Sequence, residues 1–279
     1  MIRTLLPPTL GLALLALPPS PAAAVDCPGN PAALGTARVL AIDPAITPAV
    51  GRKQFPVTLP LAPKELVLTF DDGPWPGSTA RVLAALRREC VHATFFVLGR
   101  NVMAHPALVR RALAEGHTIG HHTFSHPLLN RMPLARAEAE IDRGIAAVDR
   151  VLYGEASRTP KNAPKDTPMT PFFRFPGFAS SPALLQWLAH RHMVAFGADL
   201  WASDWNRMSP EHERELLLKR LSAAGGGIVL LHDTQSQTAT MLPGLLRELK
   251  RRGYRVVHVV PAPAGSRTAP GTADAGKPH

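Results

Sequence analysis

Two adjacent carboxylates end an apolar run in the first third of the chain. The run Glu65-Leu-Val-Leu-Thr-Phe70 is followed by Asp71-Asp72 and then by Gly73-Pro74. Packing alone gives no reason for this arrangement, because like charges repel each other and removing either one from water is costly. A metal ion, an arginine or both would relieve that cost. We therefore take Asp71 and Asp72 as candidates for metal-dependent chemistry.

Histidines supply the ligands that would complete such a site. His122 and His126 are four residues apart, and on a helical turn this spacing puts both imidazoles on one side. With a carboxylate as third ligand they would form a three-ligand site with open positions, as in catalytic zinc sites. The spacing alone is usually incidental, and it gains weight from the two acids. His121 could compete with His122, but His122 alone lies four residues from His126. His117 is more typical of a hydrogen-bonded structural histidine.

Other polar groups follow later apolar runs. They are Arg174 in Arg174-Phe-Pro-Gly177, Asp204-Trp205, and His232-Asp233 after Ile228-Val-Leu-Leu231. Taken with the acids and histidines, they predict one metal-dependent site that hydrolyses amides. Some of these residues also have a simpler interpretation. Trp205 could equally be a core aromatic residue, and Leu230 by itself is more typical of a packing residue. For Asp233 we expect a capping or loop role.

Apolar runs alternate with amphipathic stretches from Lys64 onward. We expect strands at residues 65–70, 93–98, 118–120, 172–175, 193–198, 228–231 and 254–260, and helices at 78–89, 106–115, 134–153, 181–191, 210–223 and 240–252. Seven short strands separated by helices predict an α/β fold with a parallel sheet, most simply a (β/α) barrel. The carboxyl ends of such strands converge on one face, so polar residues that follow several strands become neighbours there.

The remaining segments have their own signatures. Residues 1–24 combine Arg3, an apolar stretch broken by prolines and small residues at Ala22-Ala-Ala24, as a secretory signal peptide does, although a retained membrane anchor is an alternative. Residues 25–63 predict an extended lead-in, 154–170 an inserted loop and 261–279 a disordered tail. We expect an exported protein, periplasmic or secreted, without stable membrane insertion after signal cleavage.

The cysteines and the charge bear on compartment and partners. Cys27 and Cys90 are the two cysteines, and outside the cytoplasm they predict a disulfide, with a buried thiol at Cys90 and an idle Cys27 as the alternative. The formal net charge is +10 at pH 7, spread as single and paired basic residues. This suits an anionic cell envelope better than nucleic acid, and a solvated surface without a partner is the simplest interpretation. Nothing in the sequence indicates an oligomeric state.

The motifs resemble, in order, those of the polysaccharide deacetylases, the NodB-homology group or carbohydrate esterase family four. The resemblance covers about Lys64 to Val260, which delimits a domain of residues 64–260, and it implies a distorted (β/α) barrel of about seven parallel strands. It also implies catalytic roles. The general base would be Asp71, its partner Arg174, the general acid His232 and the partner of that acid Asp204, with Asp72, His122 and His126 as metal ligands.

Substrate contacts and activity are implied in the same way. Trp205 and Leu230 would seat the acetyl methyl group, and Pro176 and Gly177 would wall the groove, with the Gly177 amide at the oxyanion. The third motif departs from the family where Gly177-Phe178 follows the proline, since an aromatic residue usually comes first. The implied reaction is metal-dependent removal of N-acetyl groups from N-acetylglucosamine-containing glycans (chitooligosaccharide, peptidoglycan or exopolysaccharide).

The implied metal is Zn²⁺, with Co²⁺, Mn²⁺ or Ni²⁺ as alternatives, and the implied partner is the acetylated glycan. Other functions fit the same scaffold. They are an O-acetyl esterase of the acetylxylan type, a hydrolase of small cyclic amides, and a glycan-binding protein without activity. The intact Asp72, His122 and His126 set argues against the branches that work without metal.

Overall fold

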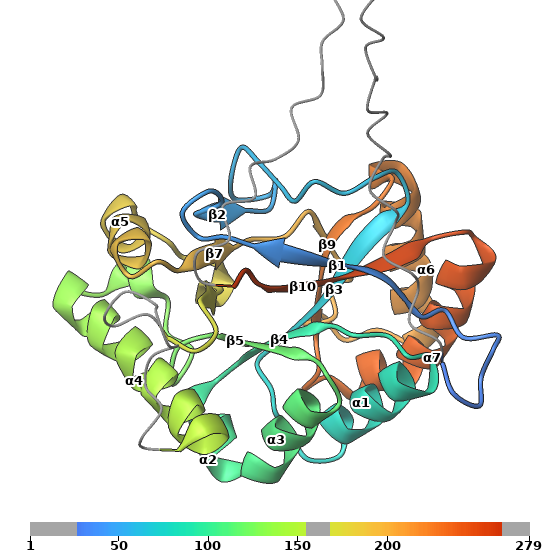
Figure 1. The fold of residues 1–279 in the computed structure, drawn as a ribbon, viewed down its shortest axis with the longest axis horizontal. Coiled ribbons are helices and arrows are strands. Elements are labelled where there is room, and N and C mark those ends of the chain that lie inside the picture. Colours follow the sequence, from blue (N-terminus) through green and yellow to red (C-terminus); the bar gives the residue numbers. More distant parts are fainter. Residues whose placement is uncertain (1–26, 155–167, 264–279) are drawn as a thin grey trace, which may run out of the picture.

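A computed structural model describes residues 27–154 and 168–263 as a parallel sheet with helices around it (Figure 1). The strands are β1 (Thr36–Ile42), β2 (Ala49–Val50), β3 (Glu65–Asp71), β4 (Thr94–Val97), β5 (Thr118–His121), β6 (Phe172–Phe173), β7 (Val194–Phe196), β8 (Leu200–Trp201), β9 (Gly227–His232) and β10 (Arg255–Pro261). The α-helices are α1 (Ser78–Arg88), α2 (Gly99–Ala104), α3 (Pro106–Ala114), α4 (Leu134–Tyr153), α5 (Pro182–His190), α6 (Pro210–Ala224) and α7 (Ser236–Arg251).

Strand β3 is the centre of the sheet. It pairs with β9 on one side, while on the other its first residues pair with β10 and its last with β4. The order continues from β4 through β5, β6 and β7 to β2, while β1 flanks β10 and β8 flanks β9. All these pairings are parallel, and none joins β7 to β8 in the described part of the chain. The expected α/β class and distorted barrel are confirmed, with hydrogen bonding that does not close the sheet.

Each of the seven expected strands and six expected helices has an observed counterpart. Strands β1, β2 and β8 and helix α2 were not expected. Strands β1 and β2 come from the predicted lead-in and pair with β10 and β7, so part of residues 25–63 belongs to the sheet. In Figure 1 they lie on the side of the strands that the α-helices leave uncovered. Strand β1 contains the short apolar run Val39-Leu-Ala-Ile42, but the residues before Ile42 in that run are partly buried or exposed, and β2 has only two residues.

Side-chain alternation divides the core into two layers. In β3, Leu66, Leu68 and Phe70 pack with residues of α1 and α7, while Val67 joins a second cluster inside the curved sheet. The inner cluster also takes Phe96 of β4, Phe172 of β6, Phe196 of β7 and Ile228 of β9. Successive strand residues point to opposite faces. Thr69 and Asp71 of β3, and Leu230 and His232 of β9, therefore share the inner face.

The two cysteines are joined. Cys27 and Cys90 form a disulfide with their Cα atoms 5.5 Å apart, as expected, and it ties the start of the described chain to the residues after α1. The Asn30 amide donates a hydrogen bond to the Arg88 carbonyl oxygen beside it (2.9 Å). The predicted signal peptide, most of the predicted inserted loop (155–167) and most of the predicted tail (264–279) lie outside the described residues.

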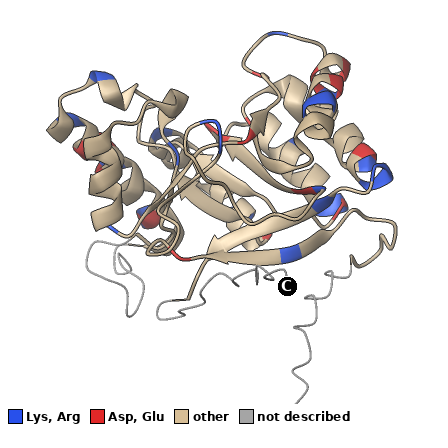
Figure 2. Cartoon of the chain, turned by 90° about the horizontal axis from the view of Figure 1, so that it is seen from above, with Lys and Arg blue, Asp and Glu red and all other residues tan. Residues whose placement is uncertain are grey.

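Two surface observations bear on the other expectations. Within the two described ranges, no helix is both long and apolar enough to cross a membrane. Lys and Arg are spread over separate elements and mixed with Asp and Glu (Figure 2).

Candidate active site and metal centre

Two strand ends bring the central polar residues together. Asp71 and His232 are register partners at the ends of β3 and β9, and both lie on the inner face. Arg174 comes two residues after Phe172 of β6, so it points inward by the same alternation. Residues that are about 60 to 160 positions apart along the chain thus meet at one rim, as the carboxyl ends of parallel strands require.

Asp72, His122 and His126 form a cluster suited to a cation. Asp72 Oδ1 lies 3.5 Å from His122 Nε2 and 3.3 Å from His126 Nε2, and the three ligand atoms lie within 4.8 Å of one another. This oxygen is buried and has no hydrogen-bond partner among the described residues. A buried carboxylate oxygen without a donor is costly unless a cation meets it. One carboxylate and two imidazoles are ligands typical of a catalytic zinc site.

His122 is oriented from behind. Its Nδ1 lies 2.7 Å from the main-chain carbonyl oxygen of Arg174. A carbonyl can only accept, so Nδ1 carries the proton and Nε2 presents its lone pair to Asp72 and His126. Burial lowers the pKa of His122 to about 3, which keeps the ring neutral and able to bind a metal.

The two histidines lie on a loop rather than on the expected helical turn. Thr123 and His126 both take left-handed backbone conformations, each with φ of 70°, and the Thr123 hydroxyl accepts a hydrogen bond from the His126 amide (3.0 Å). Strain of this kind in residues other than glycine gathers at functional sites. His121 is turned to other partners, because its Nε2 lies 3.0 Å from the Thr170 carbonyl oxygen.

Arg174 holds Asp71 inside the barrel. Its fully buried guanidinium donates to Asp71 Oδ1 (2.7 Å) and Thr69 Oγ1 (2.8 Å) from Nη1, and it lies over the Phe96 ring. Nη2 donates to the Gly197 carbonyl oxygen (2.8 Å). Burial raises the pKa of Asp71, and the charge and hydrogen bond of Arg174 work against this rise. The arginine thus favours the charged carboxylate that a general base needs.

His232 is paired with Asp204. His232 Nδ1 lies 2.8 Å from Asp204 Oδ1, and the His232 amide donates to Asp204 Oδ2 (2.7 Å). Burial alone would lower the pKa of His232, but the hydrogen bond and charge of Asp204, with the charges of Asp71 and Asp72, raise it to about 9. Asp199, the carboxylate that precedes Asp204 in the chain, has other partners. It accepts hydrogen bonds from the Arg52 and Ile228 main-chain amides and from the Thr58 hydroxyl.

Apolar groups border the same rim. Trp205 is half exposed, and its ring centroid lies 6.0 Å from that of His232 with the planes almost perpendicular. Leu230 is buried one step inward on β9, and Pro176 and Gly177 belong to a short 3₁₀ turn (Pro176–Phe178). Aromatic rings continue away from Trp205, to Trp201 at 6.0 Å and then to Phe178 at 6.2 Å.

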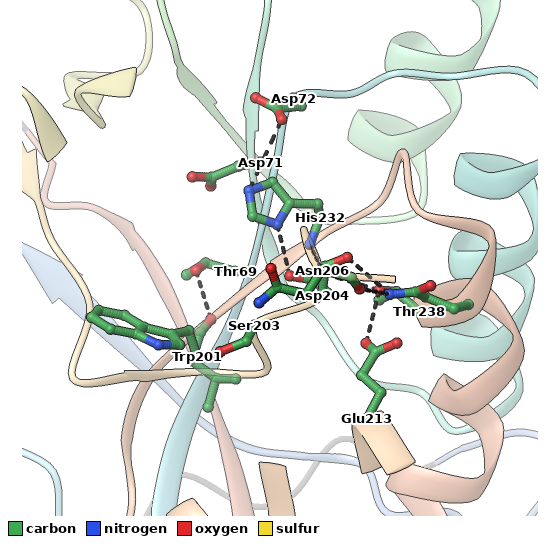
Figure 3. A network of polar contacts seen from close by, with 12 residues as sticks. Thr69, Asp71, Asp72, Trp201, Ser203, Asp204, Asn206, Glu213, His232 and Thr238 are labelled. Carbon is green, nitrogen blue, oxygen red and sulfur yellow. Dashed lines mark hydrogen bonds and ion pairs between the residues drawn. The ribbon is translucent and has the colours of Figure 1, made fainter. Parts of the chain in front are cut away.

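Some supporting residues were not singled out from the sequence. The Asn101 amide donates to the main-chain oxygen of Asp72 (2.7 Å), and Thr238 and Glu213 lie behind Asp204 (Figure 3). They sit in helices, where nothing in the local pattern marks them. Asp233, expected in a capping or loop role, is buried, accepts a hydrogen bond from Thr79 and packs so tightly on Gly73 that no side chain fits there.

Known proteins resemble this chain in sequence and in fold. A family model described as polysaccharide deacetylase matches residues 59–165. A peptidoglycan-N-acetylglucosamine deacetylase of Bacillus cereus is 33% identical over 204 residues, which cover 70% of this chain and 86% of that protein. A chitooligosaccharide deacetylase of a Bradyrhizobium strain is 32% identical over 212 residues, covering 71% and 90%.

A solved structure agrees with these relatives. The peptidoglycan deacetylase Bd3279 of Bdellovibrio bacteriovorus superposes with a TM-score of 0.69 and 32% identity, covering 81% of this chain and 59% of that one. Other curated relatives are much longer, and the chain spans 43% of the length of the first of them.

Proposed function

Because the chain belongs to the polysaccharide deacetylase family, we propose that it removes N-acetyl groups from N-acetylglucosamine-containing glycans by metal-dependent hydrolysis. The observation that carries the proposal is that the rim holds a candidate metal-binding cluster and, apart from it, a candidate base and a candidate acid. The unpartnered Asp72 Oδ1 faces two imidazole nitrogens, while Asp71 and His232 are each tied to a partner of their own.

Asp72, His122 and His126 would hold the metal. We propose Zn²⁺, with Co²⁺, Mn²⁺ or Ni²⁺ as alternatives that a site of this composition also accepts. When bound, such an ion supplies Lewis-acid polarisation of a carbonyl group and a more acidic water.

The chain's own residues would move the protons. Asp71, aimed by Arg174, takes a proton from the attacking water, and His232, protonated beside Asp204, gives one to the departing amine. The two proton transfers thus use separate groups of opposite charge. Leu230 and Trp205 would seat the acetyl methyl group, and Pro176 and Gly177 would form the opposite wall, with the Gly177 N–H as an oxyanion donor.

A glycan polymer suits the surroundings of the site. The rings of Trp205, Trp201 and Phe178 follow His232 as successive neighbours with centroids about 6 Å apart, and aromatic rings offer flat apolar faces to sugar rings. The names of the relatives support peptidoglycan or chitooligosaccharide as the substrate class. An exopolysaccharide has the same N-acetyl group, and an O-acetyl ester is the second candidate because the same groups would attack an ester carbonyl.

Acetate release tests the proposal. Purified protein is stripped of metal, reloaded with Zn²⁺, and given N-acetylglucosamine oligomers of increasing length, peptidoglycan fragments and acetylated xylan. A small cyclic amide, whose hydrolysis releases no acetate, is tested separately for ring opening. We expect zinc-dependent acetate release from the N-acetylated oligomers, with kcat/KM rising with length. Release from xylan alone would replace the proposal with an esterase, and glycan binding without any turnover would replace it with a binding protein.

We also propose an exported protein with a cleaved signal peptide at residues 1–24, a catalytic domain at 64–260 and a tail from 261. The observed disulfide supports an oxidising compartment. Sequencing the amino terminus of the protein recovered from the periplasm or medium tests the cleavage site.

A further inference from the structure

A chain of polar side chains leads from His232 into the protein interior. Asp204 lies behind His232, and the Thr238 hydroxyl of α7 lies behind Asp204, 2.9 Å from its Oδ2. The same hydroxyl lies 2.8 Å from Oε1 of Glu213 on α6 (Figure 3). Asp204, Glu213 and Thr238 are all fully buried or nearly so.

The number of available protons shows that Asp204 and Glu213 cannot both be ionised if each is hydrogen-bonded to Thr238. Threonine has one hydroxyl proton, so Thr238 can donate to one of the two carboxyl groups and must accept from the other. A carboxylate cannot donate. One of the two acids is therefore protonated if both contacts are hydrogen bonds.

The surroundings indicate which acid carries the proton. Asp204 accepts two N–H bonds from His232, one from the ring and one from the main chain, so its negative charge is well compensated. Glu213 has only the Thr238 contact, and its Oε2 is buried without a partner among the described residues. A bare carboxylate oxygen costs much more to bury than the carbonyl oxygen of a neutral acid. The pKa of Glu213 is raised to about 7: burial is the main cause and the charge of Asp204 also raises it, while the Thr238 hydrogen bond and the charge of His232 lower it.

We propose that Glu213 is a neutral carboxylic acid that donates to Thr238, so that the Thr238 hydroxyl donates to Asp204 and holds the carboxylate that orients His232. Glu213 and Thr238 are thus positioning residues for the general acid. This inference rests on the proposed function, because it assigns them to the proton that leaves with the amine.

The charged groups that act on the Glu213 carboxyl are Asp204, from the loop after β8, and His232, at the end of β9. When Glu213 ionises it can no longer donate, and Thr238 faces two acceptors. The two carboxylates then compete for the single hydroxyl proton of Thr238, so Asp204 has to share one of its three donors.

Infrared spectroscopy tests the protonation without any activity measurement. The difference spectrum between the wild type and Glu213→Gln at pH 6 should contain the carbonyl stretch of a neutral carboxylic acid, and the band should vanish when the wild type is titrated well above neutrality. Absence of the band at pH 6 would overturn the proposal. Because the protein needs no substrate here, a failure of the proposed deacetylase function leaves this result readable.

A variant series tests the positioning role. Thr238→Val removes the hydroxyl at nearly constant shape, and we expect kcat to fall about tenfold, the effect of one hydrogen bond, with KM and zinc content unchanged. Thr238→Ser should restore kcat, and Glu213→Gln should keep it within about twofold because its amide also donates. Wild-type kcat in Thr238→Val, or a loss in Glu213→Gln as large as in Thr238→Val, would refute the role. If Thr238→Val does not fold, Thr238→Ala and Thr238→Ser provide the same contrast of no hydroxyl against a hydroxyl beside Asp204.

Discussion

Two groups of three histidines in this protein lie in opposite electrostatic surroundings. The site histidines are His122, His126 and His232, and all three lie near carboxylates. The rear histidines are His92, His117 and His258. The His92 ring meets the His117 ring edge-on with centroids 5.9 Å apart, and it is tilted against the His258 ring with centroids 5.2 Å apart. Over the described ranges, none of the rear histidines forms an ion pair with a carboxylate.

The difference separates the effect of burial on the pKa of a histidine from the effect of a neighbouring carboxylate. Burial, together with the charges of neighbouring histidines, lowers the pKa of His117 to about 3 and that of His258 to about 4. His232 is also largely buried, yet Asp204 and the other carboxylates raise its pKa to about 9. Desolvation therefore makes a histidine neutral by default, and a carboxylate at hydrogen-bond distance reverses the outcome.

The largest expected effect separates the two groups by their ability to hold metal. His126→Ala should lose bound zinc and nearly all acetate release, because it leaves Asp72 and His122 as a two-ligand site. The matched control is His92→Ala, which should keep both. Metal content by elemental analysis and folding by circular dichroism are measured together. Stoichiometric zinc and full turnover in folded His126→Ala would show that the ligands are assigned wrongly.

The next effect separates the two acids beside the site histidines. Asp71→Asn should keep its metal and lower kcat by about 10²–10⁴, the usual cost of losing a general base. Asp72→Asn should instead weaken metal binding, since it removes a ligand. Equal loss of metal in both variants would contradict their separate roles.

The rear histidines should make the fold sensitive to acid. A histidine whose pKa is lower in the folded protein than the ordinary 6.5 binds its proton more readily when unfolded, so its contribution to stability is lost as pH falls below 6.5 toward the folded value. Replacing His117 by Gln, whose oxygen can still accept from the Ala93 amide, should remove about 2 kcal/mol of the loss between pH 7 and 4.5.

This prediction is checked by urea unfolding of metal-free wild type and His117→Gln at several pH values. Removing the metal keeps the loss of bound metal in acid out of the comparison. Identical pH slopes for the two proteins would mean that His117 is not neutral in the folded state.

The smallest expected effect concerns the general acid, His232, and the Asp204 carboxylate beside it. If Asp204 keeps His232 protonated, Asp204→Asn should move the basic limb of the kcat/KM profile down by about one pH unit, because the charge that favours the imidazolium is gone. Activity should fall most at alkaline pH and least at acidic pH. The limb also reflects the coupled groups around it. A basic limb that stays in place would remove Asp204 as the partner of His232.

Much of the site could be predicted from the sequence, because its residues lie in short, recognisable sequence patterns. Asp71-Asp72 and His232 each close an apolar run, and Arg174 follows one, so strand ends could be placed from a pattern of a few residues. Alternation then predicts that Asp71 and His232 share a face. The choice of His122 over His121 agrees with the structure, although the reason offered, a helical turn, was wrong, because the loop takes left-handed conformations instead.

The sequence by itself determined the α/β class and the candidate ligands, since these depend on residue type and short spacing. It also favoured the pairing of Cys27 with Cys90, because the chain has two cysteines. Only the tertiary structure decided that β1 and β2 join the sheet, because β1 is partly exposed, β2 has only two residues, and both depend on distant partners for their hydrogen bonds. It also decided that Glu213 and Thr238 meet behind Asp204. That contact depends on how α6 and α7 pack against each other and against the sheet, which no spacing along the chain encodes.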